Sequence, residues 1–240
     1  MAEETLSKKG RCLEDIRRRI LTQDVEPGSY LDEAELSEAY AISRPPLREV
    51  LNQLAGEGYV VLHKNRGAQV APMTHKTMRN FFMAAPMLYA AVSRLAAEHA
   101  TQAQIMRLKD AQTLFRKAIR DGDTAERALM NQRFHAVVGD MADNEFLTPS
   151  LRRLLIDHTR IGMSFYNPRN PSMAEQRGVA ADQHDQFIAL IEAGDADGAA
   201  QLALDHWDLS RAEIESFVTP AGMQIPLGPA PGAVARKGAS

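Results

Sequence analysis

The sequence predicts a mainly α protein in two parts: three helices with a β-hairpin, then an antiparallel bundle of helices. Apolar residues recur at helical spacing along most of the 240 residues. One short β-prone segment with a central turn interrupts them. Asp121-Gly122-Asp123 and Gly194-Asp195 each combine a helix stop with a helix start. We therefore expect two domains, residues 1–73 and 74–217, and a disordered tail at residues 218–240, which carries Pro and Gly without periodicity.

The composition is that of a globular protein, with 45% apolar and 25% charged residues. A single cysteine, Cys12, excludes an internal disulfide framework and a multi-cysteine zinc site. The chain begins without an apolar signal core, and no stretch approaches the 18 or so apolar residues of a membrane span. We therefore expect a cytoplasmic protein that does not enter membranes.

A net charge of −3 argues against nucleic-acid binding by bulk positive charge. Any DNA-binding function must come from local basic patches. Within the first domain, basic residues gather at Arg17–Arg19, in the segment from Arg44 to Arg48, and at Lys64 and Arg66.

The first domain is expected to contain helices at residues 11–22, 31–40 and 43–57. The third helix begins at Ser43, a favourable N-cap residue, and ends before Gly58. Residues 59–63 and 69–71 are β-prone and flank a turn at residues 65–67. Two helices joined by a tight turn and followed by such a hairpin form a winged helix-turn-helix domain.

Arg44 and Arg48 lie four residues apart and share the face of the third helix that is opposite its apolar stripe. Guanidinium groups on that face can donate to guanine edges or to phosphates. Most arginine pairs on helices are solvated surface charges. The neighbouring turn, the Arg17–Arg19 cluster and the basic hairpin favour the DNA-binding interpretation.

The second domain is expected to contain six helices, at residues 75–99, 101–120, 124–142, 146–163, 173–193 and 196–217. Pro86 is expected to kink or to start the first of them. Asn131 and His135 are four residues apart on one helix face. His184 and His206 are nearly equidistant from the Gly194-Asp195 turn, so two antiparallel helices would bring them together.

Three imidazoles and an amide oxygen could thus converge in the bundle core, and imidazole is a preferred ligand of zinc and similar ions. The alternative is that each histidine is an independent, hydrogen-bonded residue of the core or the surface.

The run from Glu26 to Val70, which includes SRPPLREVLNQLAGEG and NRGAQV, resembles the winged helix of GntR-type regulators. The resemblance implies that Arg44 and Arg48 contact a double-stranded DNA operator. It implies that Ser43 caps the helix and contacts phosphate, and that the wing around Gly67, with Lys64 and Arg66, enters the minor groove. Ala34 departs from the pattern, because some relatives carry a DNA-contacting Arg there.

The motifs NQRFH, QHDQFIALIEAGD and LDHW resemble the FCD sensor domain of one branch of that family. The resemblance implies a ligand-sensing domain that forms homodimers. It also implies a divalent metal, with zinc as the expected ion, held by Asn131, His135, His184 and His206. Asn131 stands where the family usually has Asp, so it supplies a neutral oxygen.

Relatives that bind small carboxylates often have an R-x-x-[LM]-E pattern early in the first sensor helix. Pro86 and Tyr89 stand there in this chain, and Arg94 on the same helix remains the candidate effector-binding residue. An organic acid is the effector that the resemblance implies.

The resemblance therefore implies a ligand-responsive repressor of a catabolic operon, which binds a palindromic operator as a homodimer. One alternative is a metal-dependent helical-bundle enzyme that uses His135, His184 and His206, but the chain lacks H-E-x-x-H and the paired Glu-x-x-His of di-iron bundles. A helical interaction module without DNA binding is the other alternative, and it would leave the SRPPLREV run unexplained.

Overall fold

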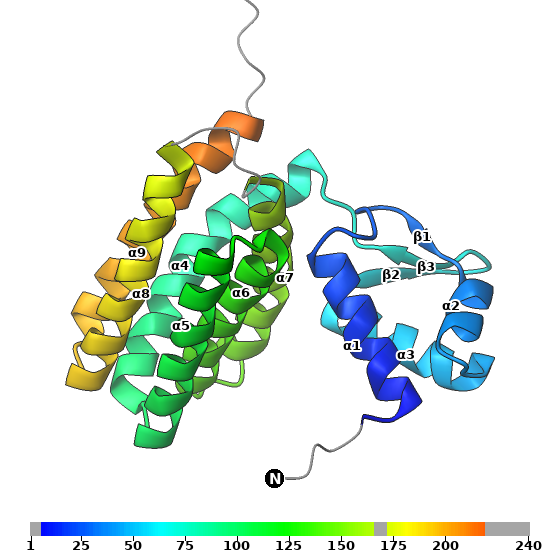
Figure 1. The fold of residues 1–240 in the computed structure, drawn as a ribbon, viewed down its shortest axis with the longest axis horizontal. Helices are drawn as coiled ribbons and strands as arrows, with labels where there is room; N and C mark the ends of the chain where they lie inside the picture. Colours follow the sequence, from blue (N-terminus) through cyan, green and yellow to red (C-terminus); the bar gives the residue numbers. More distant parts are fainter. Residues whose placement is uncertain (1–5, 166–171, 219–240) are drawn as a thin grey trace, which may run out of the picture.

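A computed structural model describes residues 6–165 and 172–218, and it shows two bodies side by side (Figure 1). The protein is mainly α, as predicted. Residues 219–240, which hold nearly all of the expected disordered tail, lie outside the described residues. The first body contains α1 (Lys8–Leu21), β1 (Tyr30–Leu31), α2 (Glu33–Ala39), α3 (Arg44–Glu57), β2 (Val60–His63) and β3 (Gly67–Val70).

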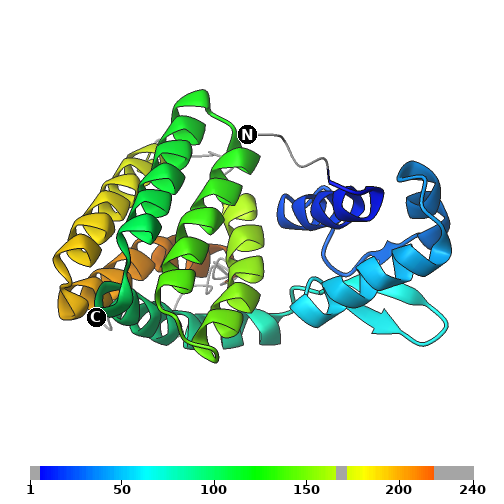
Figure 2. The same ribbon diagram turned by 90° about the horizontal axis from the view of Figure 1, so that it is seen from below.

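The second body is a bundle of α4 (His75–His99), α5 (Gln102–Asp121), α6 (Thr124–Met141), α7 (Leu147–Phe165), α8 (Ser172–Ala193) and α9 (Ala196–Val218). Both ribbon views place α7 on the side of the bundle that faces α1 (Figures 1 and 2). Helix α4 packs mainly against α9, while α5, α6 and α7 pack in chain order. In the part of the chain that the structure describes, no helix is both long and apolar enough to cross a membrane.

Local capping sets where the bundle helices begin and end. Thr101 and Gln104 form a reciprocal capping box at the start of α5. Gly122 ends that helix with φ +73°, a left-handed conformation that favours glycine. The side chain of Asp123 then accepts from the backbone N–H of Glu126 and starts α6. Each signal is local in the sequence, which is why the helix bounds are close to those predicted.

The sheet of the first body has three antiparallel strands in the order β1-β3-β2. Strands β2 and β3 form the predicted hairpin, with His63 opposite Gly67. Strand β1 was not predicted. It has two residues, and its pairing of Tyr30 with Gln69 depends on a contact between distant parts of the chain.

Each of the two bodies has its own hydrophobic core cluster. The first is built from α1, α2, α3 and the sheet, and the second from the bundle helices. Among the buried residues Ile156 is the exception, because it lies on α7 but belongs to the cluster of the first body and is 2% exposed. The bundle therefore contributes a core residue to its neighbour.

Two expectations about proline and capping are corrected in part. Pro86 does not start the first bundle helix, because α4 runs through it from His75 to His99, and a kink at Pro86 stays a prediction. Ser43 occupies the N-cap position of α3, but its side chain makes no capping hydrogen bond. The exposed Ser43 hydroxyl faces solvent without satisfying an amide of its own helix.

Candidate functional site

The exposed face of α3 carries both arginines that the sequence singled out. Arg44 and Arg48 are exposed, whereas Leu47, Val50 and Leu51 on the opposite face are buried. Arg48 lies 3.9 Å from the Glu33 carboxylate with its side chain 69% exposed, so this ion pair is loose. A helix with its arginines in solvent and its apolar stripe in a core has the form of a recognition helix.

The wing is a tight hairpin turn with two basic side chains. Lys64 and Arg66 are exposed, and they lie between the ends of β2 and β3. Asn65 and Gly67 have positive φ of 65° and 76°, which lets three residues reverse the chain. The turn thereby projects two cations away from the core of the first body.

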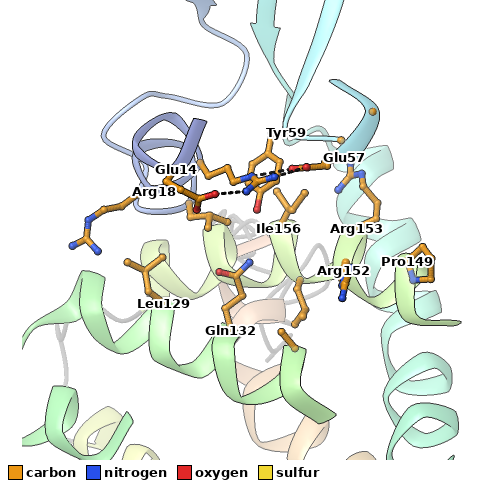
Figure 3. A pocket seen from close by; sticks show the side chains of 16 residues that line it. Glu14, Arg18, Glu57, Tyr59, Leu129, Gln132, Pro149, Arg152, Arg153 and Ile156 are labelled. Carbon is orange, nitrogen blue, oxygen red and sulfur yellow. Dashed lines mark hydrogen bonds and ion pairs between the residues drawn. The ribbon is translucent and has the colours of Figure 1, made fainter. Parts of the chain in front are cut away.

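The Arg17–Arg19 cluster does not extend this surface as expected. Arg17 forms ion pairs with Glu57 and Glu14 and is 22% exposed. It lies in a cleft of about 970 Å³ between α1 and the C-terminal end of α3 on one side and α6 and α7 on the other (Figure 3). Arg18 pairs across the cleft with Glu126 of α6 at 3.3 Å. Arg17 is thus paired within the first body, and Arg18 contacts the bundle.

Three predicted histidines converge in the bundle core. His135 of α6, His184 of α8 and His206 of α9 each place a ring nitrogen within 4.8 Å of the others. His184 stacks on Phe134 with 3.9 Å between ring centroids and 2° between planes. His184 is fully buried, and His135 is 5% exposed. Asn131 is buried on the same helix as His135, one turn before it.

Hydrogen bonds fix which nitrogen of two of these rings carries the proton. Gln112 donates its amide N–H groups to the Ala181 carbonyl at 2.7 Å and to Asp185 at 2.9 Å. Its oxygen is thereby turned toward His184, whose Nδ1–H donates to it at 3.1 Å. His206 Nδ1–H donates to the Gln183 oxygen at 2.7 Å. The Nε2 lone pairs of both rings are left for another partner.

Burial keeps the cluster neutral. It lowers the pKa of His206 to about 3, and it lowers the pKa values of His135 and His184 well below 6.5, with further depression by neighbouring imidazoles. The Nε2 atoms of His135 and His184 are buried and have no hydrogen-bond partner. Three neutral imidazoles, two with an unpartnered buried Nε2 and two with a hydrogen-bonded Nδ1, form a donor set that suits a divalent ion. These residues therefore fit a metal.

A fourth imidazole, which the sequence did not single out, lies beside this cluster. The His158 ring on α7 is 5.7 Å from that of His135, and its Nδ1 is hydrogen-bonded to the hydroxyl of Tyr89. Burial lowers the pKa of His158 to about 4. A small cavity is lined by the four residues Tyr89, His135, His158 and His206, together with Ser93, Phe187, Ala203 and Trp207.

Arg94, the candidate for effector binding, lies outside this cavity. Its guanidinium pairs with Asp197 of α9, and its side chain is 44% exposed. Ser93, one residue earlier on α4, is 4% exposed and lines the cavity instead.

Helix α7 connects the cluster to the first body. Arg160 is fully buried, pairs with Asp157, and donates to the Ala71 carbonyl at 2.6 Å. Arg153 packs against Gly58, the left-handed residue that ends α3, and pairs with Asp157 at 2.9 Å. One face of α7 thus touches the recognition helix and the segment after the wing, while His158 on the same helix reaches the histidine cluster.

Comparison with known proteins agrees with both parts of this description. The model "Bacterial regulatory proteins, gntR family" matches residues 9–70, and the FCD domain model matches residues 83–209. The chain is 26% identical over 193 residues to the HTH-type transcriptional repressor RspR of Escherichia coli, covering 80% of this chain and 82% of that protein. It is 28% identical over 180 residues to the Nta operon transcriptional regulator of Aminobacter aminovorans, covering 75% of this chain and 81% of that protein.

Solved structures show the same fold. E. coli McbR/YncC matches with a TM-score of 0.74 at 17% identity, over 90% of this chain and all of that one. A GntR-type regulator from Rhodococcus sp. RHA1 matches with a TM-score of 0.68 over 88% of this chain and 99% of that one. The matching relatives are transcription regulators and not enzymes, so the alternative of a metal-dependent helical-bundle enzyme is wrong. With an exposed recognition helix, a basic wing and a helical bundle behind them, the chain belongs to the GntR family of bacterial transcription regulators, in its FCD branch.

Proposed function

We propose that this regulator is a ligand-responsive repressor of a catabolic operon that acts in the cytoplasm. It binds a palindromic operator as a homodimer, and a small organic acid changes its affinity for that operator. Residues 1–73 bind DNA, and residues 74–217 sense the effector and dimerise. The observation that carries the proposal is that one helix, α7, contacts both the histidine cluster and the recognition helix of the same chain.

The DNA-binding part of the proposal rests on exposed cations at defined places. Arg44 and Arg48 would contact the major groove, and the open Ser43 hydroxyl a phosphate. Lys64 and Arg66 would follow the backbone beside the minor groove, where Gly67 lets the wing turn. The repressor role is supported by the names of two relatives, RspR and the galactonate operon transcriptional repressor of E. coli, which is 25% identical over 226 residues.

The sensing part rests on the metal-ligand geometry. His135, His184 and His206 would hold a divalent ion, with zinc as the expected ion, and Asn131 would add a neutral oxygen. A bound dication would supply positive charge in a bundle core for an anionic effector.

The mechanism is a shift between two arrangements of the domains. Effector entry displaces α7, and through Arg153 and Arg160 the displacement reaches Gly58 and Ala71. A coupling of about 1–3 kcal/mol would change operator affinity roughly 5- to 150-fold.

DNA binding is tested by fluorescence anisotropy with a labelled duplex from the intergenic region upstream of the gene. We expect Arg48→Ala to weaken specific binding by about 1–3 kcal/mol, the contribution of one good base contact. Arg107→Ala is the matched control, because Arg107 is also a well-exposed arginine but lies on α5 of the bundle. Undiminished specific binding by Arg48→Ala would remove that residue from the interface.

The route through α7 is tested by a pair of glycine substitutions. Gly58 and Gly122 both end helices with positive φ, so alanine strains both backbones by about 1–2 kcal/mol. A Cβ at Gly58 would lie 2.3 Å from Arg153 Cδ, whereas nothing lies within 4 Å at Gly122. We expect Gly58→Ala, and not Gly122→Ala, to change the effect of added zinc on operator affinity. Equal behaviour of the two variants would contradict the route.

A further inference from the structure

The His158–Tyr89 pair is the feature of the bundle core that the metal site leaves unused. Both residues are buried, and they come from different helices, α7 and α4. His158 lies beside the three clustered histidines but is not part of the group whose nitrogens lie within 4.8 Å of one another. Its ring packs against Phe81 and Tyr89, with centroid distances of 6.3 and 5.7 Å. It is therefore held firmly next to the metal site and not in it.

The hydrogen bond with Tyr89 orients the polar atoms of the ring. A phenolic hydroxyl is a good donor, and the lone pair of a neutral imidazole nitrogen is a better acceptor than a phenolic oxygen. The Tyr89 hydroxyl therefore donates to His158 Nδ1. The proton of the neutral ring must then be on Nε2, which becomes an N–H donor on the other edge of the ring. His158 thus differs from His184 and His206, whose Nδ1–H groups donate to glutamines.

The cavity beside this donor selects the chemistry of its occupant. It is lined by His158, by two of the clustered histidines and by the Ser93 hydroxyl, with Phe187, Ala203 and Trp207 on its apolar side. An N–H donor next to a site fit for a dication favours an oxygen with negative charge. The apolar wall favours a small hydrocarbon body on the same molecule.

We propose that His158, oriented by Tyr89, is an effector-contacting residue, and that its Nε2–H donates to the carboxylate of a small organic acid bound in this cavity beside the metal site. This inference rests on the proposed function, because it names the residue that recognises the effector there. It accounts for carboxylate recognition without Arg94, which pairs with Asp197 on the outside of the bundle.

The size of the cavity links recognition to movement. The cavity has a volume of about 10 Å³, which is room for about one water molecule. A carboxylate with even a methyl group is larger, so its entry must displace a wall. Helix α7 carries His158 in that wall and also carries Arg153 and Arg160 to the first body. Binding at His158 would therefore move the helix that reaches the recognition helix.

The test uses the full-length protein with Co²⁺ as the metal probe and sodium acetate as the carboxylate probe. The Co²⁺ absorption spectrum reports metal binding, and fluorescence of Trp207, the sole tryptophan, reports occupation of the cavity. We expect His158→Phe, which keeps a ring in the same packing, to bind Co²⁺ with a Kd within about threefold of the native value. We expect its acetate Kd to rise by about 10- to 100-fold, the effect of losing one hydrogen bond to a charged group.

Tyr89→Phe is the second variant, because it leaves His158 in place and removes only the hydroxyl that orients it. We expect a smaller rise in acetate Kd and unchanged Co²⁺ affinity. Native acetate affinity in both variants would overturn the assignment. So would a native, Co²⁺-loaded protein whose Trp207 fluorescence does not change on addition of acetate. Loss of Co²⁺ binding in His158→Phe would make His158 a metal ligand instead. A native protein that binds no Co²⁺ would overturn the metal-dependent sensing itself, which is a separate result.

Discussion

The buried ion pair of α7 offers the sharpest test of the interdomain contact. Arg160 is fully buried, and Asp157 has its side chain 8% exposed. The perturbation is a cycle of three variants: Asp157→Asn, Arg160→Met, and the two combined. Asparagine keeps the shape and the acceptor oxygen of Asp157 and removes only its charge, while methionine replaces Arg160 with a flexible apolar side chain.

The expected magnitudes differ between the two single variants. Asp157→Asn leaves the Arg160 cation buried beside a neutral partner, and removing one member of a buried pair costs about 3–5 kcal/mol. In Arg160→Met, Arg153 still pairs with Asp157 at 2.9 Å. The main loss is then the hydrogen bond to the Ala71 carbonyl, at about 1–3 kcal/mol. The double variant leaves no unpaired cation at position 160, so it should be more stable than Asp157→Asn by about 2 kcal/mol.

The assay is urea-induced unfolding, followed by circular dichroism for the whole chain and by Trp207 fluorescence for the bundle. Lys117→Met is the control, because Lys117 and Asp121 form an exposed pair on α5, 2.6 Å apart, and its removal should leave the unfolding midpoint unchanged. A double variant that loses the sum of the two single losses would refute the reasoning. So would an Asp157→Asn variant as stable as the control.

Three further predictions concern the metal, the histidines and the wing. Chelation by EDTA should lower the Tm of zinc-loaded protein by about 5–10 °C, because zinc at 100 times its Kd adds about 2.7 kcal/mol; a Tm independent of EDTA would contradict a metal in the bundle. Burial lowers the pKa of His158 to about 4 and that of His206 to about 3, so the unfolded chain takes up these protons first as the pH falls below about 6.5. The free energy of unfolding of the metal-free protein should then fall by about 1.4 kcal/mol per pH unit for each of these histidines, until the pH reaches the pKa of the folded state. Urea unfolding between pH 7.5 and 5 would measure this loss, and a free energy of unfolding that does not change with pH would disprove it. Arg66→Ala should reduce the slope of log K against log salt for operator binding by about 1, and an unchanged slope would show that the wing makes no phosphate contact through this residue.

The parts of the fold that the sequence predicts are those with local causes. Helix bounds follow from capping residues and left-handed glycines within a few positions of each end, as at Gly122 and Asp123. The approach of His184 to His206, with ring centroids 5.1 Å apart, follows from their spacing about one short turn between antiparallel helices. In the first case the residues that set a helix end lie within a few positions of it. In the second, the turn between two antiparallel helices sets which residues face each other.

The parts that the sequence did not predict depend on contacts between distant segments. His158 and Tyr89 are 69 residues apart, and no periodicity relates them. Arg160 lies three residues after Asp157, a spacing typical of an ion pair on a solvated helix face, and its burial follows from the docking of a second body on α7. The spacing of Arg153, Asp157 and Arg160 at i, i+4 and i+7 was a usable signal, because it places three charges on one helix face.

The packing of the first body on α7 also bears on how effector binding could change the affinity for DNA. If the bodies were joined only through the segment after β3, effector binding could act only through the spacing of the two DNA-binding domains in a dimer. Ile156 removes that restriction, because it places a bundle residue in the core that holds α3. Burying such a side chain is worth about 1.5–3 kcal/mol, which is the size of the coupling that regulation requires. Under the proposed mechanism, a shift of α7 that partly withdraws Ile156 would therefore change operator affinity without unfolding or a large rearrangement of either body.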